Sequence, residues 1–331
     1  MIPATRTLLA LLSALMLHTT AAAQPLEVVR LQDFPGFGNP LARIAVANKY
    51  CEKYGIRCEL RAVPAAPLGM QMLLAGDLEV QMGPQEVLFN AVARGSKLKV
   101  VALAHNTPMT FLVAGNKLAT PNAAAGYPVA MSDLKGKKIG VTARGSGPEF
   151  QVIAMLKGAG LSADDVTLVP VGAPNTALPA LSSGQIDAAM SFEPMGGLCK
   201  VQKSCRMLVD LRKGEGPPDL QVVRGAATLL TVRADYAERK PQVVTGLRAA
   251  LRDAETFVQD PANRNAVLQV LRETWELPGA DADQIRAVVL DDSMSALKSS
   301  LDAKALQSGA DTMVRAGQID KRIDTSTLLI P

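Results

Sequence analysis

The sequence is poor in aromatic residues and carries little net charge. Phenylalanine, tryptophan and tyrosine make up 4% of the 331 residues, whereas hydrophobic residues of all kinds make up 48%. The core must therefore consist mainly of Ala, Leu, Val, Ile and Met, in one large domain or two medium-sized ones. The formal net charge is only +4, and basic runs with interleaved aromatic residues are absent. We therefore do not expect nucleic acid or a membrane surface as a partner.

Long hydrophobic runs are also lacking, except near the amino terminus. Arg6 precedes an apolar run over residues 8–17, and the three alanines at 21–23 place small residues just before Gln24. This is the layout of a secretory signal peptide, and the run is shorter than the ~20 residues that a membrane-spanning helix needs. We therefore expect residues 1–23 to be removed on export and the mature protein to be periplasmic.

There are only four cysteines, and they form two close pairs along the chain, Cys51 with Cys58 and Cys199 with Cys205. In an oxidising compartment we expect two disulfides with this pairing, which is one of three possible connectivities. A zinc site is the alternative, but the separations within the pairs fit the usual spacing of zinc-binding cysteines poorly.

Histidine is scarce as well, with His18 and His105 in the whole chain. Because His18 lies in the predicted signal peptide, a metal site or a Ser-His-Asp triad would have to rely on His105 alone. The string S-x-x-K occurs at 132–135 and 295–298, but the strings that accompany it in β-lactamases are absent. We therefore expect neither catalysis nor a cofactor or metal.

Short β-type runs alternate with helical stretches from residue 26 to about residue 232. Early in the chain, strands are predicted over 26–31, 57–63 and 78–82 and helices over 41–54 and 68–75. Such alternation predicts an α/β fold with parallel sheets. From residue 236 onward the pattern is helical, most clearly over 241–258, 263–274 and 282–290.

An internal repeat is the most informative feature of the sequence. Residues 63–80 and residues 171–188 each give a β-type run, a loop with proline and a short helix that ends in L-x-x-G. In both copies a second β-type run follows and opens with an apolar and an acidic residue. Two similar α/β lobes in one chain would produce this repeat, and a chance match of two common units is the alternative.

The apolar runs 110–115 and 227–232 flank the second copy, and we interpret them as segments that cross between the lobes. On this interpretation, residues 24–107 and 234–331 form lobe I, with the carboxyl-terminal helices packed on it, and residues 108–233 form lobe II. Two lobes joined by two crossings make a hinge with a cleft, which is a common place for a small-molecule site.

The order of these motifs resembles that of periplasmic solute-binding proteins of ABC transporters. The likeness is to the aliphatic sulfonate-, taurine- and nitrate-binding group and to the related thiamine-pyrimidine-binding proteins. It is carried by the signal peptide, LAGDLEV at 74–80, DLKGKKIGV at 133–141, the stretch 181–194 that ends in SFEP, and ADY with KP at 234–241. The resemblance implies a two-lobed, type II-like fold, hinge closure on a ligand between the lobes, and delivery to a membrane permease. The long segment 116–131 and the cysteine pairs depart from the family pattern.

The loop TARGSGPEF at 142–150 is the main candidate for ligand contact. Pro148 suits the first turn of a helix, and Ser146 or Gly147 suits its amino-terminal cap. A helix amino terminus favours an anion, and Arg144 would add a bidentate contact to a carboxylate or sulfonate. The loop has neither the Walker spacing nor that of a nucleophile elbow. A plain strand-to-helix turn with a solvated arginine is the alternative.

Further candidates lie where predicted strands end, because open α/β sheets bind ligands there. Glu193 would accept hydrogen bonds from an amine or a ring nitrogen, although it would be unfavourable in a strictly anion-binding site, and a surface carboxylate is the alternative. The complete set of predicted ligand-binding residues is Phe37, Asn39, Leu68, Gln85, Arg144, Gly145, Ser146, Gly147, Asn175 and Glu193.

We therefore predict a non-enzymatic, monomeric binding protein that holds a small organic anion, a sulfonate or carboxylate, and delivers it to an ABC-transporter permease. Nitrate and a pyrimidine or thiamine precursor are alternative ligands. An exported enzyme and a sensory module on the same fold are alternative functions.

Overall fold

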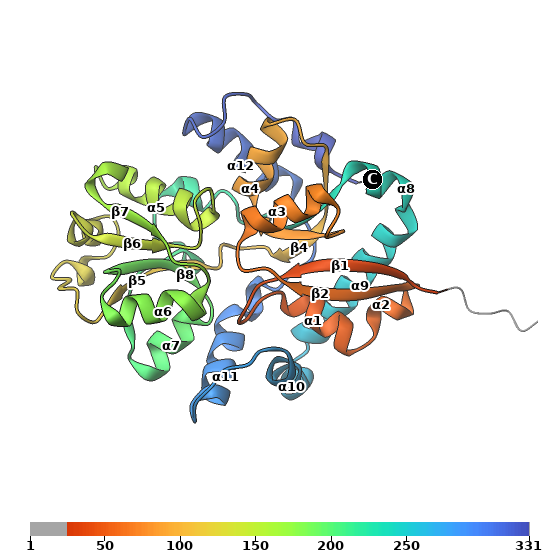
Figure 1. The fold of residues 1–331 in the computed structure, drawn as a ribbon, viewed down its shortest axis with the longest axis horizontal. Helices are drawn as coiled ribbons and strands as arrows, with labels where there is room; N and C mark the ends of the chain where they lie inside the picture. Colours follow the sequence, from red (N-terminus) through yellow and green to blue (C-terminus); the bar gives the residue numbers. More distant parts are fainter. Residues whose placement is uncertain (1–24, 331) are drawn as a thin grey trace, which may run out of the picture.

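The computed structural model describes residues 25–330, and it arranges them in two lobes that lie side by side (Figure 1). The predicted signal peptide, residues 1–23, lies outside the described residues. Within residues 25–330, no helix has the length and apolar character needed to cross a membrane.

Lobe I contains two small sheets and most of the helices, and it is drawn in red, orange, cyan and blue in Figure 1. Its strands are β1 (Glu27–Asp33), β2 (Ile56–Ala62), β3 (Gln81–Pro84), β4 (Leu98–His105) and β10 (Thr228–Arg233). Its helices are α1 (Pro40–Ala47), α2 (Tyr50–Lys53), α3 (Ala66–Ala75), α4 (Gln85–Ala93), α8 (Ala234–Arg239), α9 (Pro241–Gln259), α10 (Arg264–Thr274), α11 (Ala282–Ser293) and α12 (Ala303–Arg315). In one sheet β1 and β2 are parallel, and in the other β10 runs antiparallel between β3 and β4.

Lobe II contains one five-stranded sheet with the order β7-β6-β8-β5-β9. Its strands are β5 (Thr110–Gly115), β6 (Lys138–Val141), β7 (Thr167–Pro170), β8 (Ala188–Phe192) and β9 (Cys205–Asp210), and its helices are α5 (Gly147–Gly158), α6 (Pro174–Ser183) and α7 (Met195–Gln202). β6 is parallel to β7 and β8, whereas β5 is antiparallel to β8 and β9. The prediction of parallel sheets therefore holds for β1-β2 and for part of the lobe II sheet, which is mixed, whereas β3-β10-β4 is antiparallel. The strands that follow each crossing, β5 and β10, run antiparallel to their neighbours.

Short 3-10 helices complete the connections. They are η1 (Ala123–Ala125), η2 (Val129–Leu134), η3 (Ala163–Asp165), η4 (Leu211–Lys213), η5 (Pro218–Leu220), η6 (Pro261–Asn263), η7 (Met294–Ala296) and η8 (Thr325–Leu328).

The predicted helix over 41–54 is two helices in the structure. Asn39 caps α1 through its side chain, which accepts a hydrogen bond from the backbone N–H of Ala42, and Pro40 occupies the first helical position. The break falls at Lys49, whose φ of 56° is left-handed and cannot continue a helix. The short helix α2 then carries Cys51 toward β2.

The chain crosses between the lobes twice, once between β4 and β5 and once between β9 and β10. The predicted boundary after residue 233 would assign β10 to lobe II. Its pairing with β3 and β4 instead places Thr228–Arg233 in a lobe I sheet. We therefore propose that the second boundary lies before Thr228.

The two copies of the sequence repeat form equivalent units, one in each lobe. Gly76, with a φ of 88°, caps the carboxyl end of α3, and Gly184, with a φ of 85°, caps that of α6. Glycine adopts this left-handed conformation without steric cost, so it stops each helix and turns the chain toward the next strand. The repeat in the sequence thus has a structural counterpart in both lobes.

Apolar side chains fill the space on both sides of the sheets. In lobe I, one cluster lies among β1, α1, α9, α10 and α11, and another lies among α3, α4 and α12. In lobe II, Val141 and Val152 belong to the cluster under α5, and Phe111 and Leu181 belong to the cluster under α6 and α7. The first lobe I cluster also includes Leu198 of α7, so the two lobes share apolar contacts where α7 packs against α11.

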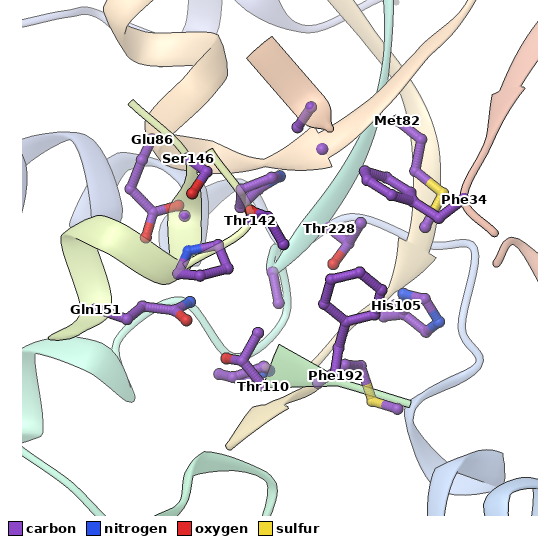
Figure 2. Close-up of a pocket in the computed structure, with 18 of the residues that line it drawn as sticks. Phe34, Met82, Glu86, His105, Thr110, Thr142, Ser146, Gln151, Phe192 and Thr228 are labelled. Carbon is purple, nitrogen blue, oxygen red and sulfur yellow. The ribbon is translucent and has the colours of Figure 1, made fainter. Parts of the chain in front are cut away.

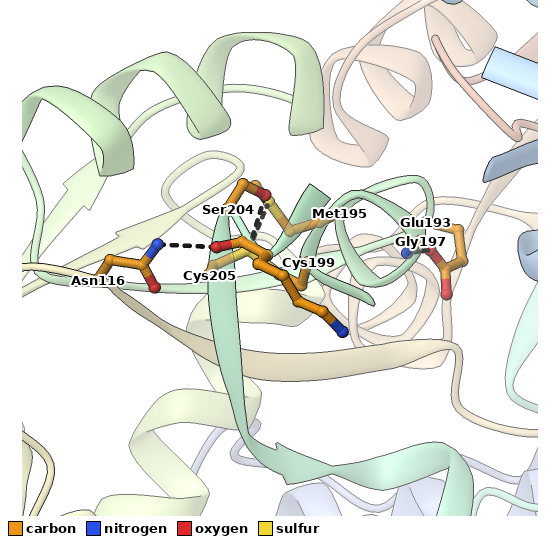
Figure 3. Close-up of a disulfide and its surroundings, with 8 residues drawn as sticks. Asn116, Glu193, Met195, Gly197, Cys199, Ser204 and Cys205 are labelled. Atoms are coloured by element: carbon orange, nitrogen blue, oxygen red, sulfur yellow. Dashed lines mark hydrogen bonds between the residues drawn. A yellow bond between two sulfur atoms is a disulfide. The ribbon is translucent and has the colours of Figure 1, made fainter. Parts of the chain in front are cut away.

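The cysteines form two disulfides, with the pairing predicted from the sequence. Cys51 and Cys58 have Cα atoms 5.9 Å apart, and Cys199 and Cys205 have Cα atoms 4.6 Å apart. No free cysteine remains within residues 25–330, so the zinc alternative for these residues is wrong. The second disulfide ties α7 to β9 immediately after the segment that carries Glu193 (Figure 3).

Candidate functional site

A cavity of about 110 Å³ lies between the two lobes, several times the 10–15 Å³ that one water molecule requires (Figure 2). The residues that line it come from both lobes and are mainly apolar. They are Phe34, Phe37, Gly38, Ala66, Met82, Gly83, Pro84, Glu86, His105, Pro108, Met109, Thr110, Thr142, Ser146, Gly147, Pro148, Gln151, Phe192, Glu193, Val223, Ala227 and Thr228.

The secondary structure explains why these residues meet. The carboxyl ends of β3, β4, β6 and β8 border the cavity, together with the first turns of α4 and α5. This is where open α/β sheets place their ligands. The two helix starts also touch, because a Cβ atom added to Gly147 would lie only 2.6 Å from Cγ of Pro84. The lobes are therefore in direct contact beside the cavity.

Aromatic rings form one wall of the cavity. Phe34 of lobe I and Phe192 of lobe II meet edge to face with ring centroids 5.8 Å apart. Phe37 packs edge to face against Trp275, at 6.2 Å. These rings give the cavity an apolar, flat-sided wall that suits the body of an organic molecule.

A buried ion pair holds the loop that carries the lobe I aromatic residues. The Arg43 guanidinium donates to the carboxylate of Asp33, at 2.9 Å, and to the carbonyl oxygens of Phe34 and Gly36. The Arg43 side chain is 3% exposed. Because the pair is bonded to the loop backbone as well, it fixes the positions of Phe34 and Phe37.

Glu86 is the principal polar residue at the other end of the cavity (Figure 2). It lies in the first turn of α4, and no other residue of the range 25–330 gives its carboxylate a hydrogen bond or an ion pair. Burial raises its pKa to about 7, although its own backbone N–H acts in the opposite direction. This carboxyl group is therefore available to a ligand as an acceptor when ionised and as a donor when protonated.

Three further polar side chains offer unpaired atoms to the same cavity. Both ring nitrogens of His105, Oγ1 of Thr110 and Oε1 of Gln151 are buried without a partner among the described residues. Burial lowers the pKa of His105 to about 4, so the imidazole is neutral at ordinary pH. Such atoms are costly to leave unpaired, which is typical of groups that a ligand satisfies.

No lysine or arginine of residues 25–330 lines the cavity. Arg144 lies outside it, because its side chain is 65% exposed and pairs with Glu149 at 2.6 Å. The Gly145 N–H also donates to Glu149, at 2.5 Å. The arginine of the TARGSGPEF loop is therefore engaged within its own loop, and it faces solvent rather than the ligand space.

Glu193 lines the cavity, but its carboxylate is already occupied. It accepts a hydrogen bond from the Gly197 N–H, at 2.9 Å (Figure 3), and another from Arg212. Arg212 in turn donates to both oxygens of Asp210 and lies over the Phe111 ring, at 4.4 Å. Burial raises the pKa of Glu193, and the Arg212 charge opposes this. Glu193 thus fixes the cavity wall and is not a free acceptor.

The cavity contains four of the predicted ligand-binding residues: Phe37, Ser146, Gly147 and Glu193. The other six lie outside it. Arg144 and Gly145 bond to Glu149, as described above. Asn175 borders a separate surface groove, and Leu68 is 44% exposed on α3.

Asn39 and Gln85 are buried, but both are used by the fold. Asn39 caps α1, and the Gln85 amide donates to the carbonyl of Ala226 at 2.6 Å. In both positions a polar residue at a helix start serves the backbone instead of the ligand space.

Sequence reasoning missed Glu86, His105, Thr110 and Gln151, which line the cavity. Glu86 directly follows the predicted Gln85, and His105 ends an apolar β-type run. His105 could have been predicted as a site residue, because it is a polar residue at the end of such a run. Thr110 and Gln151 carried no comparable signal.

Comparison with known proteins identifies the family. The profile of the NMT1-like family matches residues 38–272, which is more than half of the chain. A protein of Brucella abortus (strain 2308) whose name describes only a binding protein is 30% identical over 256 residues, covering 76% of this chain and 73% of that protein. A Brucella suis biovar 1 protein, also named only as a binding protein, gives the same values. The chain therefore belongs to the NMT1-like family.

Solved structures confirm the predicted periplasmic-binding-protein fold. The alkanesulfonate-binding protein SsuA of Xanthomonas axonopodis pv. citri, bound to MOPS, aligns with a TM-score of 0.74 and 20% identity, covering 92% of this chain and 99% of that one. The periplasmic aliphatic sulphonate-binding protein SsuA of Escherichia coli gives 0.68 and 21%, with 93% of each chain covered. The periplasmic nitrate-binding protein NrtA of Synechocystis PCC 6803 gives 0.68 and 14%, with 92% and 84% covered.

Proposed function

We propose that this protein is a periplasmic solute-binding protein that delivers its ligand to an ABC-transporter permease. The fold, the family and the cavity between the lobes support this role. Ligand contacts on both lobes would favour the closed arrangement, which the permease recognises. In this role the protein acts as a monomer without catalysis or a cofactor.

We further propose that the ligand is a small, flat organic molecule with a neutral or weakly basic nitrogen, such as an aminopyrimidine. The observation that carries this proposal is the charge of the cavity: Glu86 lines it without a partner, and no arginine or lysine among the described residues does. An ionised Glu86 accepts a hydrogen bond from an amine or ring N–H, and it repels a carboxylate or sulfonate. The aromatic wall suits a planar ring.

A small organic anion remains a second candidate, because two helix amino termini border the cavity. The first turns of α4 and α5 leave backbone N–H groups without helical partners, and helix dipoles favour an anion at that end. SsuA proteins, which have the same fold, bind sulfonates according to their descriptions. With Glu86 protonated, its O–H would donate to such an anion.

A thermal-shift screen distinguishes the two candidates, because a ligand that binds only the folded state raises the melting temperature. The probes are 4-amino-5-hydroxymethyl-2-methylpyrimidine, ethanesulfonate, acetate and nitrate at pH 8. We expect the pyrimidine to stabilise the protein and the anions to have no effect. Stabilisation by ethanesulfonate alone would overturn the aminopyrimidine proposal and favour the anion.

A further inference from the structure

Unpaired polar atoms are present at both ends of the cavity. Figure 2 shows Glu86 and Gln151 toward one end, and His105 beside Phe192 toward the other. Gln151 Oε1 and both ring nitrogens of His105 are buried without a partner in the part of the chain that the structure describes. A buried polar group without a partner destabilises the fold, and this cavity contains such groups at two separate places.

The backbone fixes His105 firmly. It is the last residue of β4, it lies opposite Thr228 of β10 in the antiparallel register, and it is 5% exposed. The adjacent crossing is bonded as well, because the Asn106 N–H donates to Ala296 at 2.9 Å. At 5% exposure, the imidazole is enclosed by its neighbours and does not reach bulk water. Its nitrogens are therefore paired by whatever enters the cavity.

We propose that His105 is a second recognition residue and that the solute carries hydrogen-bonding groups at two opposite ends. One end faces Glu86 and Gln151, the other faces His105, and the flat body lies against Phe34 and Phe192. This inference deepens the proposed function and rests on binding in this cavity. It adds a requirement for a hydrogen-bonding group at the distal end of the solute, which is the end that faces His105. The charge of Glu86 does not impose this requirement.

The chemistry of the distal group follows from the state of the imidazole. Because burial keeps His105 neutral, one ring nitrogen donates and the other accepts. A hydroxyl group, which does both, satisfies either nitrogen. A methyl group at the same place would leave both nitrogens unpaired, and the site would discriminate against it.

Matched probe pairs test this requirement by calorimetric titration. The first pair is 4-amino-5-hydroxymethyl-2-methylpyrimidine and 4-amino-2,5-dimethylpyrimidine, which differ only in the distal hydroxyl. The second pair is 2-hydroxyethanesulfonate and ethanesulfonate, which differ in the same way. We expect the wild-type protein to prefer the hydroxylated member about tenfold in whichever pair binds. Binding of the sulfonate pair would refute the aminopyrimidine proposal, but it would still test His105.

Substitutions of His105 test whether this residue causes the preference for the hydroxylated probe. His105→Leu should abolish the hydroxyl preference, His105→Gln should restore part of it because an amide also donates and accepts, and Glu86→Gln should weaken both members of the pyrimidine pair alike. An equal affinity of wild type for both members, or a preference that persists in His105→Leu, would overturn the inference.

The unfolding free energy without ligand separates recognition from a structural role. His105→Leu should leave it unchanged or raise it, since two unpaired nitrogens are removed. Tyr236→Phe is the matched control, because the Tyr236 hydroxyl is also buried without a partner among the described residues but lies outside the cavity. Unlike His105→Leu, this variant should keep the wild-type ligand affinity. A clear loss of stability in His105→Leu would make His105 a structural residue and refute the proposal.

Discussion

The first turns of α4 and α5 both border the cavity, and each carries a glutamate. Glu86 is the second residue of α4, and Glu149 is the third residue of α5. Helix amino termini favour negative charge, so both positions suit a carboxylate. Their surroundings differ, because Glu149 bonds to Gly145 and Arg144, whereas Glu86 has no partner within residues 25–330.

This difference separates a structural residue from one that we propose contacts the ligand. Glu149 holds together the loop that precedes its helix, and it is occupied before any ligand arrives. Glu86 keeps its hydrogen-bonding capacity unused in a cavity between the lobes. The same residue type in the first turns of two helices thus has different surroundings, and the contacts of each carboxylate distinguish them.

Glu86→Gln should produce the largest effect. Loss of a charged acceptor for a ligand N–H should weaken 4-amino-5-hydroxymethyl-2-methylpyrimidine binding about 10- to 100-fold at pH 8, as measured by calorimetry. Wild-type affinity should rise as the pH increases through about 7, where Glu86 ionises, and the affinity of the variant should not. Equal pH profiles in the two proteins would contradict this role.

The stability of the wild-type protein without ligand should fall as the pH rises, whereas its ligand affinity should increase. Because folding raises the Glu86 pKa from 4.5 to about 7, the folded state holds an extra proton between these values, and its stability falls as the pH rises through them. The loss from this group approaches about 3 kcal/mol. Urea unfolding should therefore show Glu86→Gln to be more stable than wild type at pH 8, with little difference at pH 4.

Gly147→Ala should weaken binding without removing a ligand contact group. The added Cβ would lie 2.6 Å from Pro84 Cγ across the lobe boundary, so the lobes could not close fully. Gly147 is the first residue of α5 and its φ is not left-handed, so alanine fits its backbone conformation. We expect an affinity loss of about tenfold and a larger radius of gyration by small-angle scattering, with ligand present. An unchanged radius and affinity would show that this contact does not limit closure.

Glu149→Gln should lower stability and leave the pH profile of binding intact. The amide retains a weaker hydrogen bond from Gly145 but loses the ion pair with Arg144. A loss of about 1 kcal/mol in the unfolding free energy is expected. A large change in ligand affinity would mean that Glu149 and Glu86 are less different than their contacts indicate.

Arg144→Ala should have the smallest effect. The arginine side chain is 65% exposed, and exposed ion pairs contribute about 0–1 kcal/mol. Calorimetry should give the wild-type affinity for pyrimidine and sulfonate probes alike. A selective loss of sulfonate affinity would restore Arg144 as an anion-binding residue.

The features that could be predicted from the sequence are those that a short stretch of residues determines. The glycines that end α3 and α6, the alternation of strand and helix, and the close spacing within each cysteine pair all lie within short stretches. Each feature depends on backbone conformation or on the distance between near neighbours, so a single segment contains enough information to predict it.

The contents of the cavity were less predictable, because they depend on contacts between distant segments. Arg144 and its partner Glu149 are close in sequence, yet nothing in the sequence shows that this pair forms in preference to a ligand contact. The cavity brings Glu86, His105 and Gln151 together from α4, β4 and α5. Their importance appears only when the unpaired atoms on these separate elements share one enclosed space.

The contact between Phe37 and Trp275 places the tryptophan where its intrinsic fluorescence can report on the cavity. Trp275 is the single tryptophan of the chain, it is 3% exposed, and its ring meets a phenylalanine that lines the cavity. The Arg286 guanidinium also lies 5.8 Å from the centroid of its ring. All indole emission therefore comes from one site beside the ligand space. Ligand binding and lobe movement can be followed by intrinsic fluorescence in the unlabelled protein.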